Sequence, residues 1–223
     1  MAAAPARTIC PGFREYLGWV REEVEGLTDA QLDWEDPSQE WAQWSIRRQV
    51  SHVALACLFW MVRQWGKELF PKNPPPPPVD FSKAAVYDRR LDEERYWRME
   101  DILGKLEEAV AFIEGVIARE TAESVRAKTL TKRFPPELPM GKTEEKVYEF
   151  WLKVAPFHED GGVRHEEGDP HLWHFTLLGT LRHLYWEGLV HLNTVQRLKR
   201  AQGLPPRVRL PEVGYLTSPL FKG

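Results

Sequence analysis

A chain of 223 residues with 43% hydrophobic and 12% aromatic residues is long enough to bury a sizeable core and too apolar to be disordered. Its formal net charge of -3 lacks the basic excess of a nucleic-acid-binding protein, and the pair Arg47 and Arg48 is too small to change that. No window approaches the roughly 20 apolar residues of a membrane span, and the N-terminal segment lacks the apolar core of a signal sequence. We therefore expect one domain over residues 1–223 that binds neither nucleic acid nor membranes.

The two cysteines indicate a reducing compartment. Cys10 lies in the N-terminal segment and Cys57 in an apolar helical run, so the chain predicts neither a disulfide framework nor a cysteine metal site. We expect a cytoplasmic protein. Arginine outnumbers lysine and asparagine occurs only at Asn73 and Asn193, a bias typical of thermophilic proteins.

The first part of the chain predicts two long helices joined by a loop. Apolar residues recur at helical spacing over residues 11–27, and a short capped turn follows at residues 28–32. The second helix should cover residues 45–70, with Ser45 as its N-cap. The loop before it carries three tryptophans, Trp34, Trp41 and Trp44. These rings would pack over one end of the helices or line the wall of a pocket.

The middle of the chain alternates between stiff, helical and irregular patterns. Residues 71–90 form a proline-rich crossover, interpreted as a connection between helices, with recognition by a partner protein as the less favoured alternative. A third helix should cover residues 91–120, charged at first and then amphipathic. Residues 121–170 contain several proline and glycine breakers and predict an irregular insert with a short helix at residues 143–154.

The longest helical pattern covers residues 172–202. Its core-facing positions follow one another in steps of three and four: Leu177, Leu181, Leu184, Gly188, His191, Val195 and Leu198. Residues 204–223 then form an extended tail that docks on the helices or on a second subunit. Together these elements predict an all-α fold, a four-helix bundle with long crossover loops, a short extra helix and an extended C-terminal tail.

Three side chains on two of these helices have the spacing of metal ligands. His52 lies in the apolar second helix, where a buried imidazole needs a polar partner. On the last helix Glu187 precedes His191 by one turn, roughly 6 Å along the axis. Two imidazoles and one carboxylate suit a divalent metal ion and leave coordination positions open. His183 stands one turn before Glu187 and could replace a ligand, but it lies about two turns, roughly 12 Å, from His191.

The other histidines define no site by spacing alone. They lie among acidic residues in a polar hairpin or loop: His158, His165, His171 and His174. A solvated loop is the favoured interpretation, and a cation site is the alternative. Ser45 and Ser51 lie near His52 without the order of a serine hydrolase triad. Cys57 lies in an apolar setting that predicts an inert thiol.

Two stretches of the chain resemble the DinB/YfiT-like superfamily. The first is LTDAQLDWEDPSQEWAQWSIRRQVSHVALA, residues 27–56, in which a loop leads to Trp44 and Ser45 and His52 follows two turns later. The second is the sequence EGLVH from Glu187 to His191, which aligns with a His-x-x-x-His pair on the family's last helix. The resemblance covers roughly the first and last thirds of the chain.

This resemblance implies a four-helix bundle with a three-histidine site for a divalent metal ion, often nickel or zinc. Several branches of this family are associated with metal-dependent transfer or isomerisation that involves a low-molecular-weight thiol, so the resemblance implies such a reaction here. His52 and His191 carry over directly, whereas Glu187 stands where the family has its other histidine. A carboxylate is a legitimate ligand for these ions, so we expect zinc or nickel first and manganese or iron second.

The leading hypothesis is therefore a metal-dependent enzyme that acts on a small-molecule substrate, a thiol transferase before a hydrolase. His52, Glu187 and His191 would hold the ion, and the walls of the pocket would come from Trp34, Trp41, Trp44 and Trp186. The alternative is a non-catalytic bundle that binds a small ligand or a protein partner, in which Glu187 only accepts a hydrogen bond from a histidine. The apolar residues within 213–221 favour a homodimer.

Overall fold

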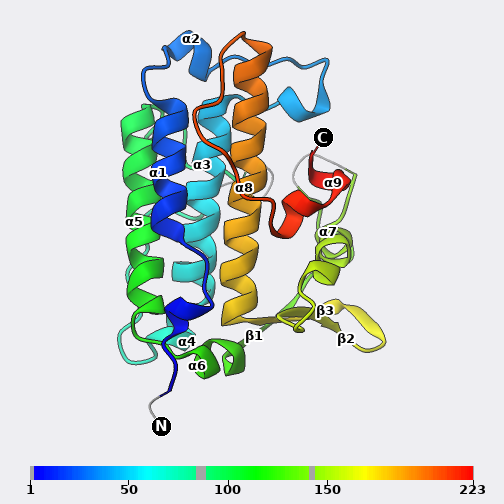
Figure 1. Cartoon of the computed structure of the whole chain (residues 1–223). Coiled ribbons are helices and arrows are strands. Elements are labelled where there is room, and N and C mark those ends of the chain that lie inside the picture. Colours follow the sequence, from blue (N-terminus) through cyan, green and yellow to red (C-terminus); the bar gives the residue numbers. More distant parts are fainter. Residues whose placement is uncertain (1–2, 84–88, 141–143, 223) are drawn as a thin grey trace.

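Four long helices dominate the structure, a computed structural model that describes residues 3–83, 89–140 and 144–222. These helices lie side by side (Figure 1): α1 (Phe13–Val24), α3 (Ile46–Leu58), α5 (Met99–Ile117) and α8 (Leu177–Ala201). α1 and α3 each pack against both α5 and α8, so the apolar faces of all four helices meet in one core. The expectation of a mostly helical protein is confirmed.

Shorter helical elements connect and cover the long helices. They are η1 (Ala6–Thr8), α2 (Asp29–Leu32), η2 (Glu40–Ala42), η3 (Phe59–Gln64), α4 (Gly66–Leu69), α6 (Ala122–Ala127), α7 (Val147–Val154), η4 (Ala155–Phe157), η5 (Gly214–Thr217) and α9 (Pro219–Lys222). The predicted capped turn at residues 28–32 is α2. Thr28 caps it, because its side chain accepts a hydrogen bond from the Gln31 backbone N–H at 3.3 Å.

A small sheet corrects the expectation of an all-α fold. It has three antiparallel strands in the order β1 (Thr129–Arg133), β3 (Asp169–Thr176), β2 (Val163–Glu166). Trp173 and Phe175 on β3 are fully buried while their neighbours are partly exposed, which is the alternation of a half-buried strand. Residues 172–176 are therefore a strand, and the long helix predicted from residue 172 begins at Leu177.

A close backbone contact joins this sheet to the start of α8. Thr176 is the N-cap, with its hydroxyl accepting from the Gly179 N–H at 2.9 Å. A Cβ built on Gly179 would lie 2.0 Å from the carbonyl oxygen of Gly162, so only glycine allows the turn before β2 to sit on this helix. The contact fixes where α8 begins. The core stripe predicted along α8 is confirmed at six of its seven positions, while His191 is only partly buried; the buried ones are Leu177, Leu181, Leu184, Gly188, Val195 and Leu198.

Two other helices begin further along the chain than the sequence predicts. The third helix starts at Met99 rather than at residue 91, because Asp92 forms a local turn in which its carboxylate accepts from the Glu94 N–H at 3.2 Å. The short helix of the insert, α7, starts at Val147, and its predicted first residue, Thr143, lies outside the described residues. The second helix continues past α3 as a π-helical turn, η3, and then as α4.

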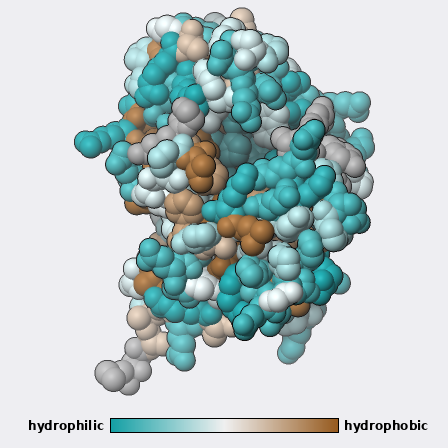
Figure 2. Space-filling model, turned by 90° about the vertical axis from the view of Figure 1, so that its right-hand side faces the viewer, coloured by the Kyte–Doolittle hydropathy of each residue, from teal (hydrophilic) through white to brown (hydrophobic). Residues whose placement is uncertain are grey.

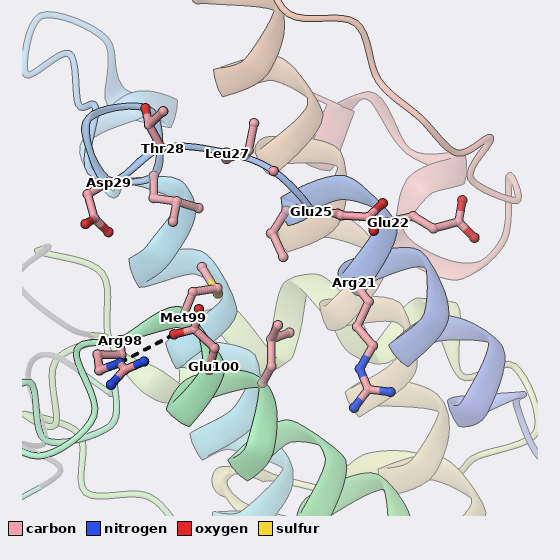
Figure 3. A pocket seen from close by; sticks show the side chains of 13 residues that line it. Arg21, Glu22, Glu25, Leu27, Thr28, Asp29, Arg98, Met99 and Glu100 are labelled. Atoms are coloured by element: carbon pink, nitrogen blue, oxygen red, sulfur yellow. Dashed lines mark ion pairs between the residues drawn. The ribbon is translucent and has the colours of Figure 1, made fainter.

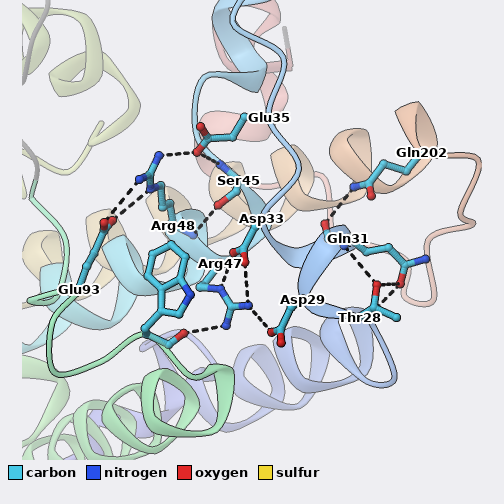
Figure 4. Close-up of polar contacts among 11 residues, drawn as sticks. Thr28, Asp29, Gln31, Asp33, Glu35, Ser45, Arg47, Arg48, Glu93 and Gln202 are labelled. Carbon is cyan, nitrogen blue, oxygen red and sulfur yellow. Dashed lines mark hydrogen bonds and ion pairs between the residues drawn. The ribbon is translucent and has the colours of Figure 1, made fainter.

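Ion pairs tie the tryptophan loop to the start of α3 (Figure 4). Ser45 is the N-cap, as expected, and its hydroxyl accepts from the Arg48 N–H at 3.4 Å. The acidic partners of the next two arginines are Asp29 and Asp33 for Arg47, and Glu35 and Glu93 for Arg48. The side chain of Arg47 is only 2% exposed, while its partners Asp29 and Asp33 are 87% and 33% exposed, so these ion pairs join a buried guanidinium to the surface. This anchoring places Trp44 next to the turn of α3 that carries His52.

The C-terminal segment folds back onto α8 (Figure 1). The expected docking of this tail on the helices is confirmed, although η5 and α9 make its last part helical rather than extended. Gly214 has φ +53°, and a Cβ there would lie 2.1 Å from the Trp186 ring, so glycine lets the segment lie directly on α8. No helix in the described ranges is both long enough and apolar enough to cross a membrane.

Candidate metal centre

The structure brings His52, Glu187 and His191 together between α3 and α8. One nitrogen from each histidine and one carboxylate oxygen all lie within 4.8 Å of one another. A tetrahedral ion with bonds of about 2.1 Å separates its ligands by roughly 3.4 Å, so modest side-chain rotations close this group around an ion. In the described part of the chain no other trio of histidine, cysteine and acidic residues is close enough to share an ion.

Hydrogen bonds orient both imidazoles for this role. Nδ1 of His52 lies 2.8 Å from the carbonyl oxygen of Arg89, which can only accept, so Nδ1 carries the hydrogen. Nδ1 of His191 lies 2.5 Å from Oε1 of Gln49, while the Gln49 Nε2 donates to the Trp44 carbonyl oxygen at 3.3 Å. Each histidine therefore presents the lone pair of its Nε2. Metal-binding histidines are held in the same way, with the second nitrogen donating to a carbonyl, so the residues present fit a divalent cation.

The Glu187 carboxylate has a histidine at each oxygen. Oε1 lies 3.3 Å from Nε2 of His52, and Oε2 lies 3.2 Å from Nε2 of His183. Burial alone would raise the pKa of the Glu187 carboxyl, but His183 and His52 outweigh it and hold this pKa well below its usual range. The carboxylate is therefore anionic at neutral pH. A lone pair on the His52 Nε2 would face this anion unfavourably unless a metal ion or a proton lies between them.

His191 is neutral at physiological pH. Burial, assisted by the positive charge that His52 can carry and opposed by Glu187, lowers the pKa of His191 to about 3. Metal ions bind the neutral imidazole, so no proton has to leave His191 near pH 7 before it can serve as a ligand.

Trp44 forms one wall of this group. Its ring lies 5.3 Å from the His52 ring and is stacked 6.4 Å from the His191 ring, measured between centroids. Glu187 keeps 15% of its side chain exposed, so the group is not sealed from solvent. The face of the molecule seen in Figure 2 has a recess with hydrophilic atoms in its depth and hydrophobic side chains along part of its rim.

The other tryptophans expected in the pocket wall lie elsewhere. Trp186 packs on His158, with 4.9 Å between ring centroids, and on the C-terminal segment. Trp41 lies under the guanidinium of Arg197 at 4.2 Å, and Trp34 is a partly buried side chain against the core. Of these four tryptophans, Trp44 is therefore the one whose ring contacts the candidate ligands.

The loop histidines need one correction. His158 is not solvated but 2% exposed, and burial together with His183 lowers its pKa to about 3. His165 and His174 lie on the β2–β3 hairpin, and Nε2 of His174 pairs with Glu166 at 2.8 Å. His171 packs against Tyr148, with ring centroids 4.5 Å apart. The hairpin expectation is met at β2 and β3, whereas His158 belongs to the core.

Sequence reasoning missed the residues that hold the candidate ligands. Gln49 lies one turn before His52 on the same face of α3, so helical spacing could have found it. The Arg89 carbonyl and the Tyr215 hydroxyl come from distant segments, and no local pattern marks them. The sequence predicts His183 only as a replacement ligand, whereas its Nε2 contacts Oε2 of Glu187, and Oε1 is the oxygen that contacts His52.

A separate cavity of about 720 Å³ lies between α1, α2 and the start of α5 (Figure 3). Its rim is charged, with Arg21, Glu22, Glu25, Asp29, Arg98 and Glu100. Several of these groups have partners already: Arg98 pairs with Glu100 at 3.6 Å, and Asp29 pairs with Arg47 at 2.6 Å. None of the three candidate metal ligands lines this cavity.

The fold and the His-Glu-His group place this protein in a class: mostly helical proteins with a candidate metal site between long helices. The sequence identifies the family within this class: the chain belongs to the DinB superfamily, whose family profile matches residues 19–161, more than half of its length. His52 lies inside the matched span, and Glu187 and His191 lie beyond it. No curated protein and no solved structure matches the chain.

Proposed function

We propose that this protein is a divalent-metal-dependent enzyme built on a four-helix bundle, with His52, Glu187 and His191 as the metal ligands. The observation that carries the proposal is the pair of oriented imidazoles. Both Nδ1 atoms bind carbonyl oxygens, which leaves both Nε2 atoms free for a metal ion, and one nitrogen of each ring lies within 4.8 Å of the Glu187 carboxylate. Zinc or nickel suits two nitrogens and one oxygen best, followed by manganese or iron.

An ion held by three protein ligands supplies Lewis-acid chemistry and lowers the pKa of a water or thiol in its open position. Trp44 shields the two histidines on one side, which restricts the approach of substrate to the remaining side. Glu187 adds a negative charge that the family's histidine would not supply, and this charge partly neutralises the ion.

We propose a low-molecular-weight thiol as co-substrate, and a transferase rather than a hydrolase, on the strength of the family resemblance. The chain's own thiols are poor nucleophiles. Burial raises the pKa of Cys10 to about 11, and burial together with Glu187 raises that of Cys57 further. The thiol would therefore come from the substrate. Thiol consumption by metal-loaded protein but not by a His52→Ala variant would support this, and equal consumption by both would contradict it.

The second candidate function is a non-catalytic helical protein. The observation in its favour is that Glu187 already contacts His52 and His183 at hydrogen-bond distances, an arrangement that one additional proton would satisfy without a metal ion. Such a protein would bind a small ligand or a protein partner and hold no stoichiometric metal. The cytoplasmic location and the homodimer stay predictions from the sequence.

Replacing Glu187 by histidine separates these two functions. If Glu187 is a ligand, Glu187→His restores a three-nitrogen site and should tighten zinc or nickel binding by about tenfold or more, because these ions favour imidazole over a single carboxylate oxygen. Glu187→Gln is the matched control, since it keeps the shape of the side chain, removes its charge and should weaken binding. The measurement is a competition titration against a coloured chelator. Unchanged or weaker zinc affinity in Glu187→His would show that Glu187 does not face the ion.

A further inference from the structure

A buried chain of hydrogen bonds runs from Glu187 to the C-terminal segment. His183 Nε2 lies 3.2 Å from Glu187 Oε2, and His183 Nδ1 lies 2.8 Å from the Tyr215 hydroxyl. The same hydroxyl lies 3.2 Å from Nε2 of His158. His183, Tyr215 and His158 are 2%, 1% and 2% exposed, so water does not compete for these bonds.

Only one assignment of donors and acceptors satisfies all of these hydrogen bonds. The Glu187 carboxylate can only accept, so His183 donates from its Nε2–H, and its Nδ1 is left as an acceptor. The Tyr215 hydroxyl then donates to His183 Nδ1, and the Tyr215 oxygen accepts from the His158 Nε2–H. This leaves His158 Nδ1 as a lone pair, and that atom is indeed buried without a hydrogen-bond partner. The reverse direction would leave a buried N–H without an acceptor at His158 and two lone pairs facing each other at Glu187.

The surroundings hold Tyr215 rigidly. Its ring packs against Phe157, Trp186 and Phe221, with centroids 5.3, 5.4 and 5.2 Å away. Trp151 of α7 lies 4.5 Å from the His183 ring, which limits rotation of that imidazole. Neither His183 nor Tyr215 is within the candidate group of metal ligands, so their contacts act on Glu187 and through it on the site.

We propose that His183 and Tyr215 are positioning residues of the metal centre, which hold Glu187 Oε2 and leave Oε1, the oxygen facing His52, as the single ligand atom. This inference rests on the proposed function and adds the C-terminal segment to the site. Without the hydrogen bonds from His183 and Tyr215, the Glu187 carboxylate would be free to rotate or to present both oxygens to the ion. The affinity and the geometry of the metal site would then change. Outer-shell partners of metal ligands typically contribute 10- to 100-fold to metal affinity.

The test compares Tyr215→Phe with Tyr16→Phe. Both substitutions remove a buried hydroxyl that is hydrogen-bonded to α8, because Tyr215 bonds to His183 at 2.8 Å and Tyr16 donates to the Gly188 carbonyl oxygen at 3.2 Å. Tyr215→Phe should weaken cobalt and zinc binding by about 10- to 100-fold and alter the visible absorption of the cobalt-loaded protein, whereas Tyr16→Phe should leave the affinity within about threefold. The melting temperature of the metal-free variants shows whether both remain folded.

A double variant tests whether Tyr215 acts through His183. If it does, His183→Ala with Tyr215→Phe should bind cobalt no more weakly than His183→Ala alone. Additive losses, or wild-type affinity and spectrum in Tyr215→Phe, would overturn the inference while leaving the metal function intact. Absence of metal binding in the wild-type protein would overturn the proposed function and the inference with it.

Discussion

Replacing His52 by alanine should lower the affinity for a divalent metal ion at least about 100-fold while the protein stays folded. The substitution removes the only candidate ligand from α3, so the ion would be left with Glu187 and His191 on a single helix. Because only three or four ligands supply the binding free energy of a protein zinc site, removing one of them lowers the metal affinity strongly. A chelator-competition titration with zinc measures the affinity, and far-ultraviolet circular dichroism measures the helix content.

Ser51→Ala is the matched control for this experiment. Ser51 is buried in the same turn of α3, and its hydroxyl accepts from the Leu91 N–H at 3.1 Å, a bond in which none of the three candidate ligands takes part. It should retain zinc affinity while losing a comparable local contact. Full metal binding by His52→Ala, with or without this control, would rule out His52 as a ligand.

Breaking a buried ion pair between α1 and α8 should cause a large loss of stability. Glu23 and Lys199 have side chains that are 0% and 2% exposed and contact each other directly. Glu23 also accepts from Gln196 Nε2 and from the backbone N–H groups of Arg207 and Val208 at 2.8, 2.8 and 2.9 Å. Glu23→Gln would leave the Lys199 ammonium buried without a counter-charge, which typically costs about 3–5 kcal/mol of unfolding free energy.

Urea denaturation checks this expectation, with Glu25→Gln as its control. Glu25 is 78% exposed and pairs with Arg207, so its loss should change stability by less than about 1 kcal/mol. A Glu23→Gln protein as stable as the wild type would contradict the account. Adding Lys199→Met to Glu23→Gln should recover part of the loss, because the uncompensated charge is then gone.

The Glu23–Lys199 ion pair makes the stability of the protein depend on pH. Burial opposes ionisation of Glu23, but its bonds to Lys199, Val208, Gln196 and Arg207 prevail and lower the pKa of its carboxyl below the reference value of 4.5. A group whose pKa is lower in the folded protein stabilises it above the unfolded pKa and loses that effect as the pH falls through the folded pKa. The stability difference between wild type and Glu23→Gln should therefore be full near pH 7 and shrink progressively below about pH 4.5.

The helices and the candidate ligands could be predicted from sequence because both depend on local periodicity. The step of four from Glu187 to His191 places both on one side of α8 whatever surrounds them, and Ser45 marks the start of α3 by its own chemistry. Spacing within one helix says nothing about its neighbours, so the pairing of His52 with the last helix rests on the tendency of helical bundles to build metal sites between facing helices, and the family resemblance agrees with it.

The sheet and the support of Glu187 could not be predicted in the same way. The strand β3 leads directly into α8, so the helical pattern predicted from residue 172 includes Trp173 and Phe175, whose alternation belongs to the strand. Tyr215 meets His183 across 32 residues of chain, through a segment placed by tertiary packing. Contacts of this kind depend on the whole fold rather than on a local pattern.

The central claim is that His52, Glu187 and His191 hold a divalent metal ion. Elemental analysis of wild type and His191→Ala, each purified without an affinity tag or chelator, tests it most directly. If these residues hold the ion, the wild type should contain near-stoichiometric zinc, nickel, manganese or iron, and His191→Ala should lose it. Absence of metal from the wild type, even after incubation with each ion in turn, or equal metal in both proteins, would contradict it.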